Sequence, residues 1–276
     1  MNKVILALGV MLIFSGSAFA QKGALNLKSR AVHIFDTQQG RTLYSKNTDT
    51  VMPIASITKL MTAMIVLDAQ LPLTEEITID SADIDVLKNT RSRLHVGASL
   101  TRQELLRLAL MSSENRAAAA LGRAYPGGIE AFVAAMNDKA FELGMGNSYF
   151  VDSTGLSSTN VSTARDLVKM VEAAYGYDII RQFSTTSAHA VELTDNRRSM
   201  QFTNSNSLIR SGSWQIDVSK TGFLSEAGRC LVMQANITGK PVIIVLLDSN
   251  GKNTRSSDAN RIKKWMEAGL ARKRSS

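Results

Sequence analysis

Cysteine and histidine are scarce in this sequence, and each shortage narrows what the protein can be. One of the 276 residues is cysteine, Cys230, so the chain cannot form an internal disulfide and its fold depends on the hydrophobic core. The thiol lies in an apolar stretch, 230–233, which favours a buried structural role. The histidines His33, His95 and His189 show no metal-ligand spacing. We therefore predict that the protein holds no metal and no other cofactor.

Long hydrophobic runs are also missing, apart from one near the start. Val4–Phe14 is apolar but shorter than the roughly 20 residues of a membrane-spanning helix. Lys3 precedes this run, and Ala18–Ala20 follows it as a small-residue cleavage site. These features predict a secretory signal peptide over residues 1–20 that is cleaved on export. No cysteine lies near that site, so we expect no lipid attachment there.

The mature chain, residues 21–276, has no internal repeat and no linker rich in proline or glycine. Its length suits one large domain or two small ones. The whole chain carries a formal net charge of +8, which falls by one when Lys3 is removed. A solvated basic surface is the plainest interpretation, and loose attraction to anionic wall polymers or to a membrane surface is the alternative. An exported chain is not expected to bind nucleic acid.

Three short polar motifs follow one another along the chain: Ser-Ile-Thr-Lys at 56–59, Ser-Glu-Asn at 113–115 and Lys-Thr-Gly at 220–222. Two other segments, 249–252 and 158–160, match the first two patterns by spacing alone. Segment 249–252 falls in an Asn-Gly turn, where no helix would hold its serine beside its lysine. Order and context therefore favour the first three motifs.

The first motif pairs a nucleophile with a base. Apolar residues follow Ser56 as far as Leu67, which predicts a buried helix with Ser56 in its first turn. Residues i and i+3 share a helix face, so Lys59 can reach the Ser56 hydroxyl. Lysine accepts a proton only when neutral, and burial or a second cation, here Lys220, would lower its pKa. We predict Ser56 as nucleophile, Lys59 as base and the Ser56 N–H as one oxyanion donor.

The second motif follows a helix that begins with a T-x-x-E capping pattern, Thr101 to Glu104. Ser113 and Asn115 lie at the junction with the next helix. In an extended junction residues i and i+2 point the same way, so both side chains would face one cleft while Glu114 faces elsewhere. A polar turn without catalytic role is the alternative, and the other two motifs argue against it.

The third motif closes a strand predicted from apolar alternation over 214–220. Lys220 supplies positive charge, Thr221 a hydroxyl for a substrate carboxylate, and Gly222 lets a substrate backbone lie close to the strand. The N–H of Phe223 is the candidate for the second oxyanion donor. Taken alone, Lys-Thr-Gly is usually a strand end that runs into a turn.

The order of predicted elements describes a mixed α/β (α+β) protein. A hairpin of 31–36 and 41–45 precedes a helical block from Ser56 to about residue 182. Strands are then predicted at 188–193, 199–204, 214–220, 229–237 and 242–248, followed by a helix at about 256–269. We expect an antiparallel sheet of about five strands from both chain ends, covered by the helical block, with the cleft between the two parts. The last helix packs on the sheet or, alternatively, lies on a membrane surface.

The three motifs resemble those of the low-molecular-mass penicillin-binding proteins, most closely the D-alanyl-D-alanine endopeptidases of the penicillin-binding protein 7 type. The resemblance spans the mature chain and includes Met52–Ser56, Asp152–Leu156, Ser162–Leu167 and Glu226–Cys230. It implies a periplasmic serine DD-peptidase domain over 21–276, with the fold of β-lactamases and DD-peptidases and without a firm membrane anchor.

The resemblance also implies a role for each motif residue: Ser56 is acylated, Lys59 is its base, Ser113 and Lys220 relay the proton, Asn115 holds the substrate backbone and Thr221 takes a carboxylate. β-Lactams would acylate Ser56 as covalent inhibitors. The arginine that assists Thr221 is not identified by any pattern, and Arg197, Arg198 and Arg229 are the candidates.

The implied reaction is hydrolysis of a peptide bond between D-centres in cross-linked peptidoglycan. Removal of a terminal D-alanine is the alternative, and a non-catalytic wall-binding or β-lactam-sensing protein is a third hypothesis. A class A β-lactamase carries its deacylating glutamate where this chain reads Asn147–Val151, so we predict that β-lactams stay attached to Ser56. About 54 residues follow Gly222, which favours the short endopeptidase type over carboxypeptidases with an added C-terminal domain.

Overall fold

The computed structural model describes residues 25–193 and 199–274, so the predicted signal peptide and the candidates Arg197 and Arg198 lie outside the described residues. The strands are β1 Ser29–Asp36, β2 Arg41–Lys46, β3 Met52–Pro53, β4 Glu76–Thr78, β5 Ser99–Thr101, β6 Val161–Ser162, β7 Ala188–Glu192, β8 Ser199–Thr203, β9 Gln215–Leu224, β10 Gly228–Ile237 and β11 Lys240–Ser249. The α-helices are α1 Lys59–Asp68, α2 Arg102–Met111, α3 Asn115–Arg123, α4 Gly128–Glu142, α5 Ala164–Tyr175, α6 Asp178–Thr185, α7 Ser207–Arg210 and α8 Thr254–Arg274. Two 3₁₀ turns, η1 Ala55–Thr58 and η2 Ser81–Asp83, complete the set.

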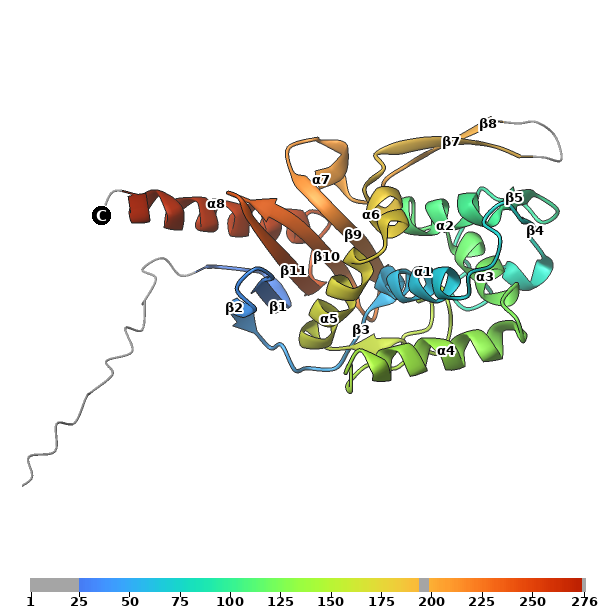
Figure 1. Ribbon diagram of the computed structural model, residues 1–276, viewed down its shortest axis with the longest axis horizontal. Helices are drawn as coiled ribbons and strands as arrows, with labels where there is room; N and C mark the ends of the chain where they lie inside the picture. The colour runs from blue at the N-terminus through green and yellow to red at the C-terminus, as the bar shows by residue number, and fades with distance from the viewer. Residues whose placement is uncertain (1–24, 194–198, 275–276) are drawn as a thin grey trace, which may run out of the picture.

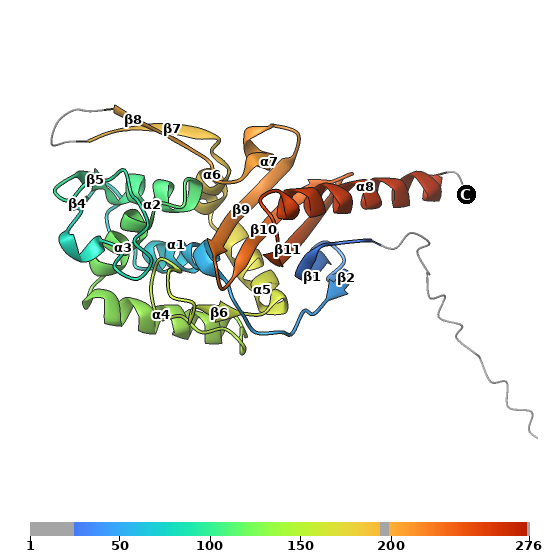
Figure 2. The same cartoon turned by 180° about the vertical axis from the view of Figure 1, so that it is seen from behind.

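Strands from the first and the last part of the described chain form one antiparallel sheet of five strands in the order β2-β1-β11-β10-β9. β1 pairs with β11 from Ser29 opposite Ser249 to Asp36 opposite Val242. The helical block lies between β2 and β9 in sequence and to one side of the sheet in space (Figures 1 and 2). The predicted fold class is confirmed.

The central strands are buried on both faces, which explains why Val242–Leu247 reads as an unbroken apolar run. Along β11, Val242, Ile244 and Leu246 pack with α8 on one face. The alternate residues Ile243, Val245 and Leu247 join the main core with the helical block. The last helix therefore packs against the sheet, as expected from its apolar stripe.

The helix α1 runs through the middle of the helical block (Figure 1). Its residues from Lys59 to Val66 are all buried, as the apolar sequence predicts. The start differs from the prediction, because Ser56 lies in the 3₁₀ turn η1 and the α-helix begins only at Lys59. Ala55, just before the serine, has a positive φ of 49°. The motif therefore spans a tight turn and the first residue of the helix.

Two predicted strands, 188–193 and 199–204, form a separate hairpin and do not join the main sheet. In β7 and β8 the side chains of Val191 and Phe202 are buried, and His189 Nε2 lies 2.7 Å from Glu104 Oε2. Glu104 is also the glutamate of the predicted capping pattern. The cap itself is present, because Thr101 Oγ1 accepts from the Glu104 N–H at 3.2 Å. The hairpin is an arm along the helical block (Figure 1).

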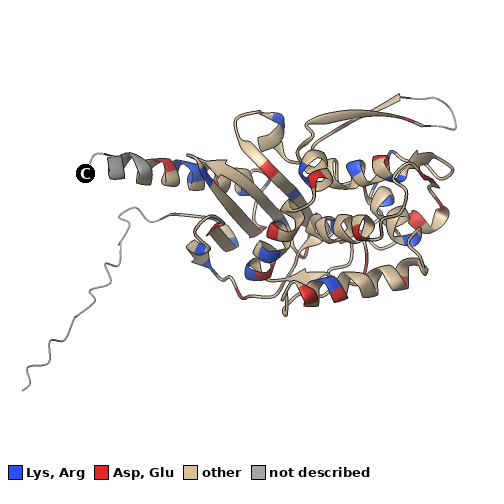
Figure 3. Ribbon diagram, viewed as in Figure 1, with Lys and Arg blue, Asp and Glu red and all other residues tan. Residues whose placement is uncertain are grey.

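Lysine and arginine are spread over the described chain and recur along α8 (Figure 3). In the described ranges, no helix has the length and apolar character needed to cross a bilayer.

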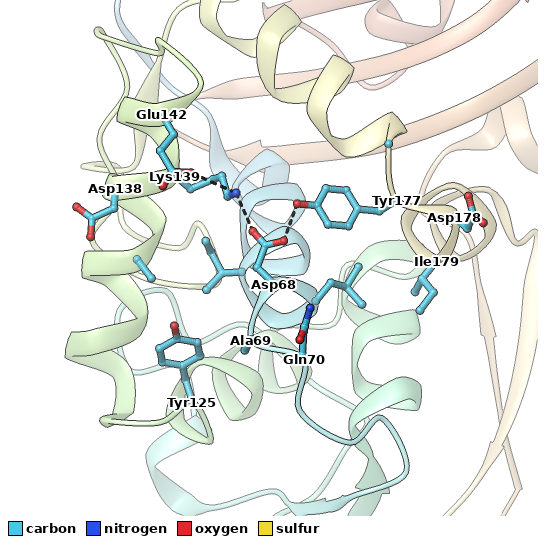
Figure 4. Close-up of a pocket in the computed structure, with 14 residues that line it drawn as sticks. Asp68, Ala69, Gln70, Tyr125, Asp138, Lys139, Glu142, Tyr177, Asp178 and Ile179 are labelled. Carbon is cyan, nitrogen blue, oxygen red and sulfur yellow. Dashed lines mark hydrogen bonds and ion pairs between the residues drawn. The ribbon is translucent and has the colours of Figure 1, made fainter.

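The far end of α1 lies beside a cavity of about 970 Å³ between α1, α4 and the start of α6 (Figure 4). Asp68, the last residue of α1, accepts a 2.7 Å hydrogen bond from the Tyr177 hydroxyl and pairs with Lys139 Nζ at 2.8 Å. Burial, followed by the hydrogen bond to Asp68, raises the pKa of Tyr177 to about 12. These contacts join the end of α1 to α4 and to the residue that precedes α6.

The Tyr177 hydroxyl makes the free energy of unfolding depend on pH in the alkaline range. A group with a raised pKa binds its proton more tightly in the folded state, so its contribution is complete below pH 10 and is lost as pH rises toward 12. We expect the free energy of unfolding of Tyr177→Phe to fall less steeply over that interval than that of the wild type. Tyr125→Phe, which changes another tyrosine of the same cavity, is the control for chemical denaturation at each pH. Equal slopes for all three proteins would contradict this prediction.

Candidate functional site

The structure brings the three motifs together where η1, the α2–α3 junction and β9 meet. Lys59 Nζ lies 2.9 Å from Ser56 Oγ and 2.7 Å from Asn115 Oδ1. Lys220 Nζ donates to Ser113 Oγ at 2.8 Å. Two serine–lysine pairs from distant parts of the chain therefore share one site.

Lys59 is completely buried, and burial lowers the pKa of its ammonium group to about 7. The negative charges of Asp152, Glu114 and Asp85 act in the opposite direction. The sequence offered burial and the charge of Lys220 as causes of a lowered pKa, and burial is the largest effect on Lys59. Lys220 donates to Ser113 and to the Thr221 carbonyl, and its own pKa is well below the ordinary value because of burial and then the charge of Lys59.

The junction that carries Ser113 is not extended, contrary to the prediction. Ser113 has a φ of +63°, in the left-handed region that residues other than glycine seldom occupy. This conformation turns its hydroxyl to Lys220, while Asn115 at the start of α3 contacts Lys59. Each residue thus reaches a different lysine. Such strain commonly accompanies functional positions.

Gly222 of the third motif packs against residues of the turn before Ser56. A Cβ on Gly222 would lie 2.8 Å from the carbonyl oxygen of Ile54 and 3.1 Å from the Cβ of Ala55. The missing side chain therefore lets β9 pack directly on the turn that carries Ser56, whereas the sequence assigned this closeness to a substrate. The adjacent Phe223 side chain is 55% exposed, and the Arg229 guanidinium lies 4.5 Å from its ring centroid.

Three groups at the site were missed from the sequence. The carbonyl oxygen of Thr154 accepts from Lys59 Nζ at 2.6 Å, and Ser205 Oγ accepts from Thr221 Oγ1 at 2.7 Å. Arg255 of α8 donates through one NH group to the carbonyls of Gly222 and Cys230, at 2.9 and 3.2 Å. Burial lowers the pKa of its guanidinium group. Ser205 and Arg255 lie outside every motif and matching segment, and Thr154 lies in the matching segment Asp152–Leu156 but was assigned no role.

A family model described as D-alanyl-D-alanine carboxypeptidase, of peptidase family S11, matches residues 18–251. The chain belongs to this peptidase family. A D-alanyl-D-alanine endopeptidase of Pseudomonas aeruginosa is 49% identical over 243 residues, which cover 88% of this chain and 78% of that protein. An Escherichia coli D-alanyl-D-alanine endopeptidase is 44% identical, with 96% and 87% covered. The crystal structure of the Streptomyces K15 DD-transpeptidase superposes with a TM-score of 0.81 at 33% identity, covering 88% of this chain and 98% of that one.

Members of the S11 family are serine hydrolases that act on peptidoglycan peptides, typically through an acyl-serine, and are sensitive to β-lactams. The predicted family and the predicted serine-type peptidase are thereby confirmed. The relatives are cell-wall enzymes. The roles of the individual motif residues stay predictions, supported by the geometry described above.

Proposed function

We propose that this protein hydrolyses D-alanyl cross-links in peptidoglycan as a DD-endopeptidase, with Ser56 as the acylated residue. The observation that carries the proposal is a serine hydroxyl 2.9 Å from a buried lysine whose pKa is about 7. An amine with that pKa has a substantial neutral population near neutral pH and can act as a base. We further propose a cleaved signal over residues 1–20, a periplasmic DD-peptidase domain over 21–276, and at most loose electrostatic association with wall or membrane.

Acylation begins when Ser56 Oγ attacks the carbonyl carbon of the scissile peptide bond while Lys59 Nζ takes the hydroxyl proton. The tetrahedral intermediate collapses as the C–N bond breaks, and the proton that Lys59 took passes through Ser113 and Lys220 to the leaving amine, which leaves Lys59 neutral again. Water then hydrolyses the acyl-Ser56 ester, and the serine regains its proton. The backbone N–H groups of Ser56 and Phe223 are our candidates to stabilise the oxyanion.

The substrate carboxylate is proposed to bind at Thr221 with Arg255 behind it. Thr221 Oγ1 already donates to Ser205, so its proton can be redirected to a carboxylate with Ser205 close by. Arg255 lies against the backbone of Gly222 and adds positive charge to this end of β9. Asn115 contacts Lys59 through Oδ1 and Thr90 through one N–H of Nδ2. Its amide nitrogen has a second N–H, which we propose donates to the substrate backbone while the contact to Thr90 is kept.

Removal of a terminal D-alanine remains the competing reaction on the same residues. The family model carries the carboxypeptidase description, whereas the relatives at 44–49% identity are named endopeptidases. We therefore favour the cross-link as substrate. The test is to incubate the mature protein with a cross-linked muropeptide dimer and with a monomeric pentapeptide, beside Ser56→Ala. Cleavage of the dimer alone supports an endopeptidase, and trimming of the pentapeptide alone makes the protein a carboxypeptidase.

β-Lactam adducts are expected to persist on Ser56, because the Asn147–Val151 segment supplies no glutamate to activate a deacylating water. Fluorescent penicillin should label the wild type stably and leave Ser56→Ala unlabelled. Turnover within seconds would contradict the prediction. If neither protein is labelled and neither muropeptide changes, the hypothesis of a non-catalytic wall-binding protein replaces ours.

A further inference from the structure

The amino group of Lys59 has three neighbours and, when neutral, only two N–H bonds to give. The carbonyl oxygen of Thr154 accepts at 2.6 Å and can do nothing else. Asn115 Oδ1 is likewise an acceptor, at 2.7 Å. These two contacts use both N–H bonds, so the lone pair is left for the third neighbour, the Ser56 hydroxyl at 2.9 Å. The direction of the lone pair therefore depends on what fixes the two acceptors.

The Thr154 carbonyl is fixed by Asp152. Asp152 Oδ1 accepts from the N–H groups of Thr154 and Gly155 at 2.7 and 2.6 Å, and from Thr154 Oγ1 at 2.7 Å. Its Oδ2 accepts from the Ser157 N–H at 3.0 Å and from Asn160 Nδ2 at 2.6 Å. Five donors from one short loop converge on a single carboxylate, which leaves this loop little freedom to turn the carbonyl away from Lys59.

The Asn115 amide is fixed by a second carboxylate. Asn115 Nδ2 donates to Thr90 Oγ1 at 2.9 Å, and Thr90 Oγ1 donates its own proton to Asp85 Oδ2 at 2.7 Å. Asp85 also accepts from the N–H groups of Leu87, Lys88 and Thr90, each at 2.9 Å. Because the Thr90 hydroxyl proton is committed to Asp85, its oxygen must accept from Asn115. That requirement keeps Oδ1 of Asn115 on the lysine side.

We propose that Asp152 and Asp85 are positioning residues that act through Thr154 and through Thr90–Asn115 to aim the lone pair of Lys59 at Ser56. The inference rests on the proposed function, in which Lys59 is the base. Neither carboxylate touches the reacting atoms. Their contribution is to supply a fixed direction for the proton transfer, for which small displacements are costly.

The same carboxylates also raise the pKa of Lys59 through their charge. A residue with a purely structural role would not shift that pKa. The charged groups that act on Lys59 are Asp152, Glu114 and Asp85, which raise its pKa, while Lys220 lies across the site. Removing the charge of Asp152 therefore lowers the pKa of Lys59. Acylation requires the neutral amine, so the acid limb of the pH–rate profile moves to lower pH.

The experiment measures the second-order rate of acylation by a chromogenic cephalosporin between about pH 5 and about pH 9, where this limb lies. For Asp152→Asn we expect a plateau about 10- to 100-fold lower, because the carbonyl of Thr154 is no longer fixed, and an acid limb displaced to lower pH. For Thr90→Val we expect a plateau about fivefold lower, the equivalent of one hydrogen bond, with the limb unmoved because no charge is lost.

Asp166→Asn is the matched control. Asp166 is also a buried carboxylate, and it holds the same region of chain through the Asn147 N–H at 2.8 Å and Ser148 Oγ at 3.1 Å. Asp166 is not among the charges that shift the pKa of Lys59. The acid limb of the Asp166→Asn pH–rate profile should therefore lie at the same pH as that of the wild type.

An Asp152→Asn limb or plateau equal to the wild-type value overturns the proposal. If Asp152→Asn does not fold, the test depends on Thr90→Val, which should fold because Thr90 is exposed. A Thr90→Val plateau rate equal to that of the wild type would also overturn the proposal. Failure of the proposed function looks different, because the wild type itself would not be acylated.

Discussion

Replacing Lys59 by methionine should slow acylation of Ser56 by about 10²–10⁴-fold, the usual contribution of a general base. Methionine fills a similar volume in a buried site, so the loss would report the amine and not a collapsed helix. The wild-type rate should rise tenfold per pH unit below pH 7 and level off above it, since only the neutral amine accepts the proton. Lys59→Met should lack this limb, and stopped-flow acylation across the pH range measures both effects.

Lys139→Met is the matched control for that experiment. Lys139 pairs with Asp68 at the other end of α1, a helix of 10 residues and therefore about 15 Å long. Its loss should reduce stability and leave the acid limb in place. A Lys59→Met protein that folds and acylates within tenfold of the wild type would remove Lys59 from the role of base.

Gly155→Ala should disrupt the site from the opposite side. A Cβ on Gly155 would lie 2.1 Å from the carbonyl oxygen of Ala55 and 2.9 Å from Thr58 Oγ1, and Gly155 has a φ of +79°. The strained backbone costs roughly 1–3 kcal/mol and the steric overlap adds roughly 1–3 kcal/mol. Since Ala55 directly precedes Ser56, relief of the overlap moves the nucleophile. We expect a large loss of stability together with loss of penicillin labelling.

Two other glycines separate these contributions. Gly40 and Gly97 have φ values of +59° and +93°, on either side of that of Gly155, and a Cβ at either would meet nothing within 4 Å. Gly40→Ala and Gly97→Ala therefore carry the backbone strain without the overlap, and their labelling should persist. Denaturant unfolding of the three variants compares the costs. A Gly155→Ala protein no less stable than these two would show that the loop yields easily.

The sequence was most informative where side chains carry the chemistry. Ser56, Lys59, Ser113 and Lys220 were placed in one site because the three motifs occur together, in order, and resemble those of the penicillin-binding proteins. The strands of the main sheet followed from apolar patterning, since burial on both faces leaves a continuous signal in β11. Thr163, directly before α5, accepts from the Asp166 N–H at 3.1 Å, which is the usual role of a threonine at a helix start.

What the sequence did not reveal depends on backbone position and on packing between distant elements. Thr154 acts through a carbonyl that every residue possesses, so no residue type announces it. Arg255 reaches Gly222 only because α8 crosses the sheet at one particular place. The left-handed backbone of Ser113 is imposed by its surroundings, as local propensity favours other conformations for serine.

The pairing of β1 with β11 has a consequence for when activity can arise. Ser29 finds Ser249 only after nearly the whole chain has been made, and β9, with Lys220, joins the same sheet through β10. Contacts between such distant segments form slowly, because a long loop must close first. Lys220 is held in this sheet by strands from both ends of the described chain, so the site next to Ser56 is complete only when those strands have paired. A shortened or nascent chain that lacks β10 and β11 should therefore have no acylation site.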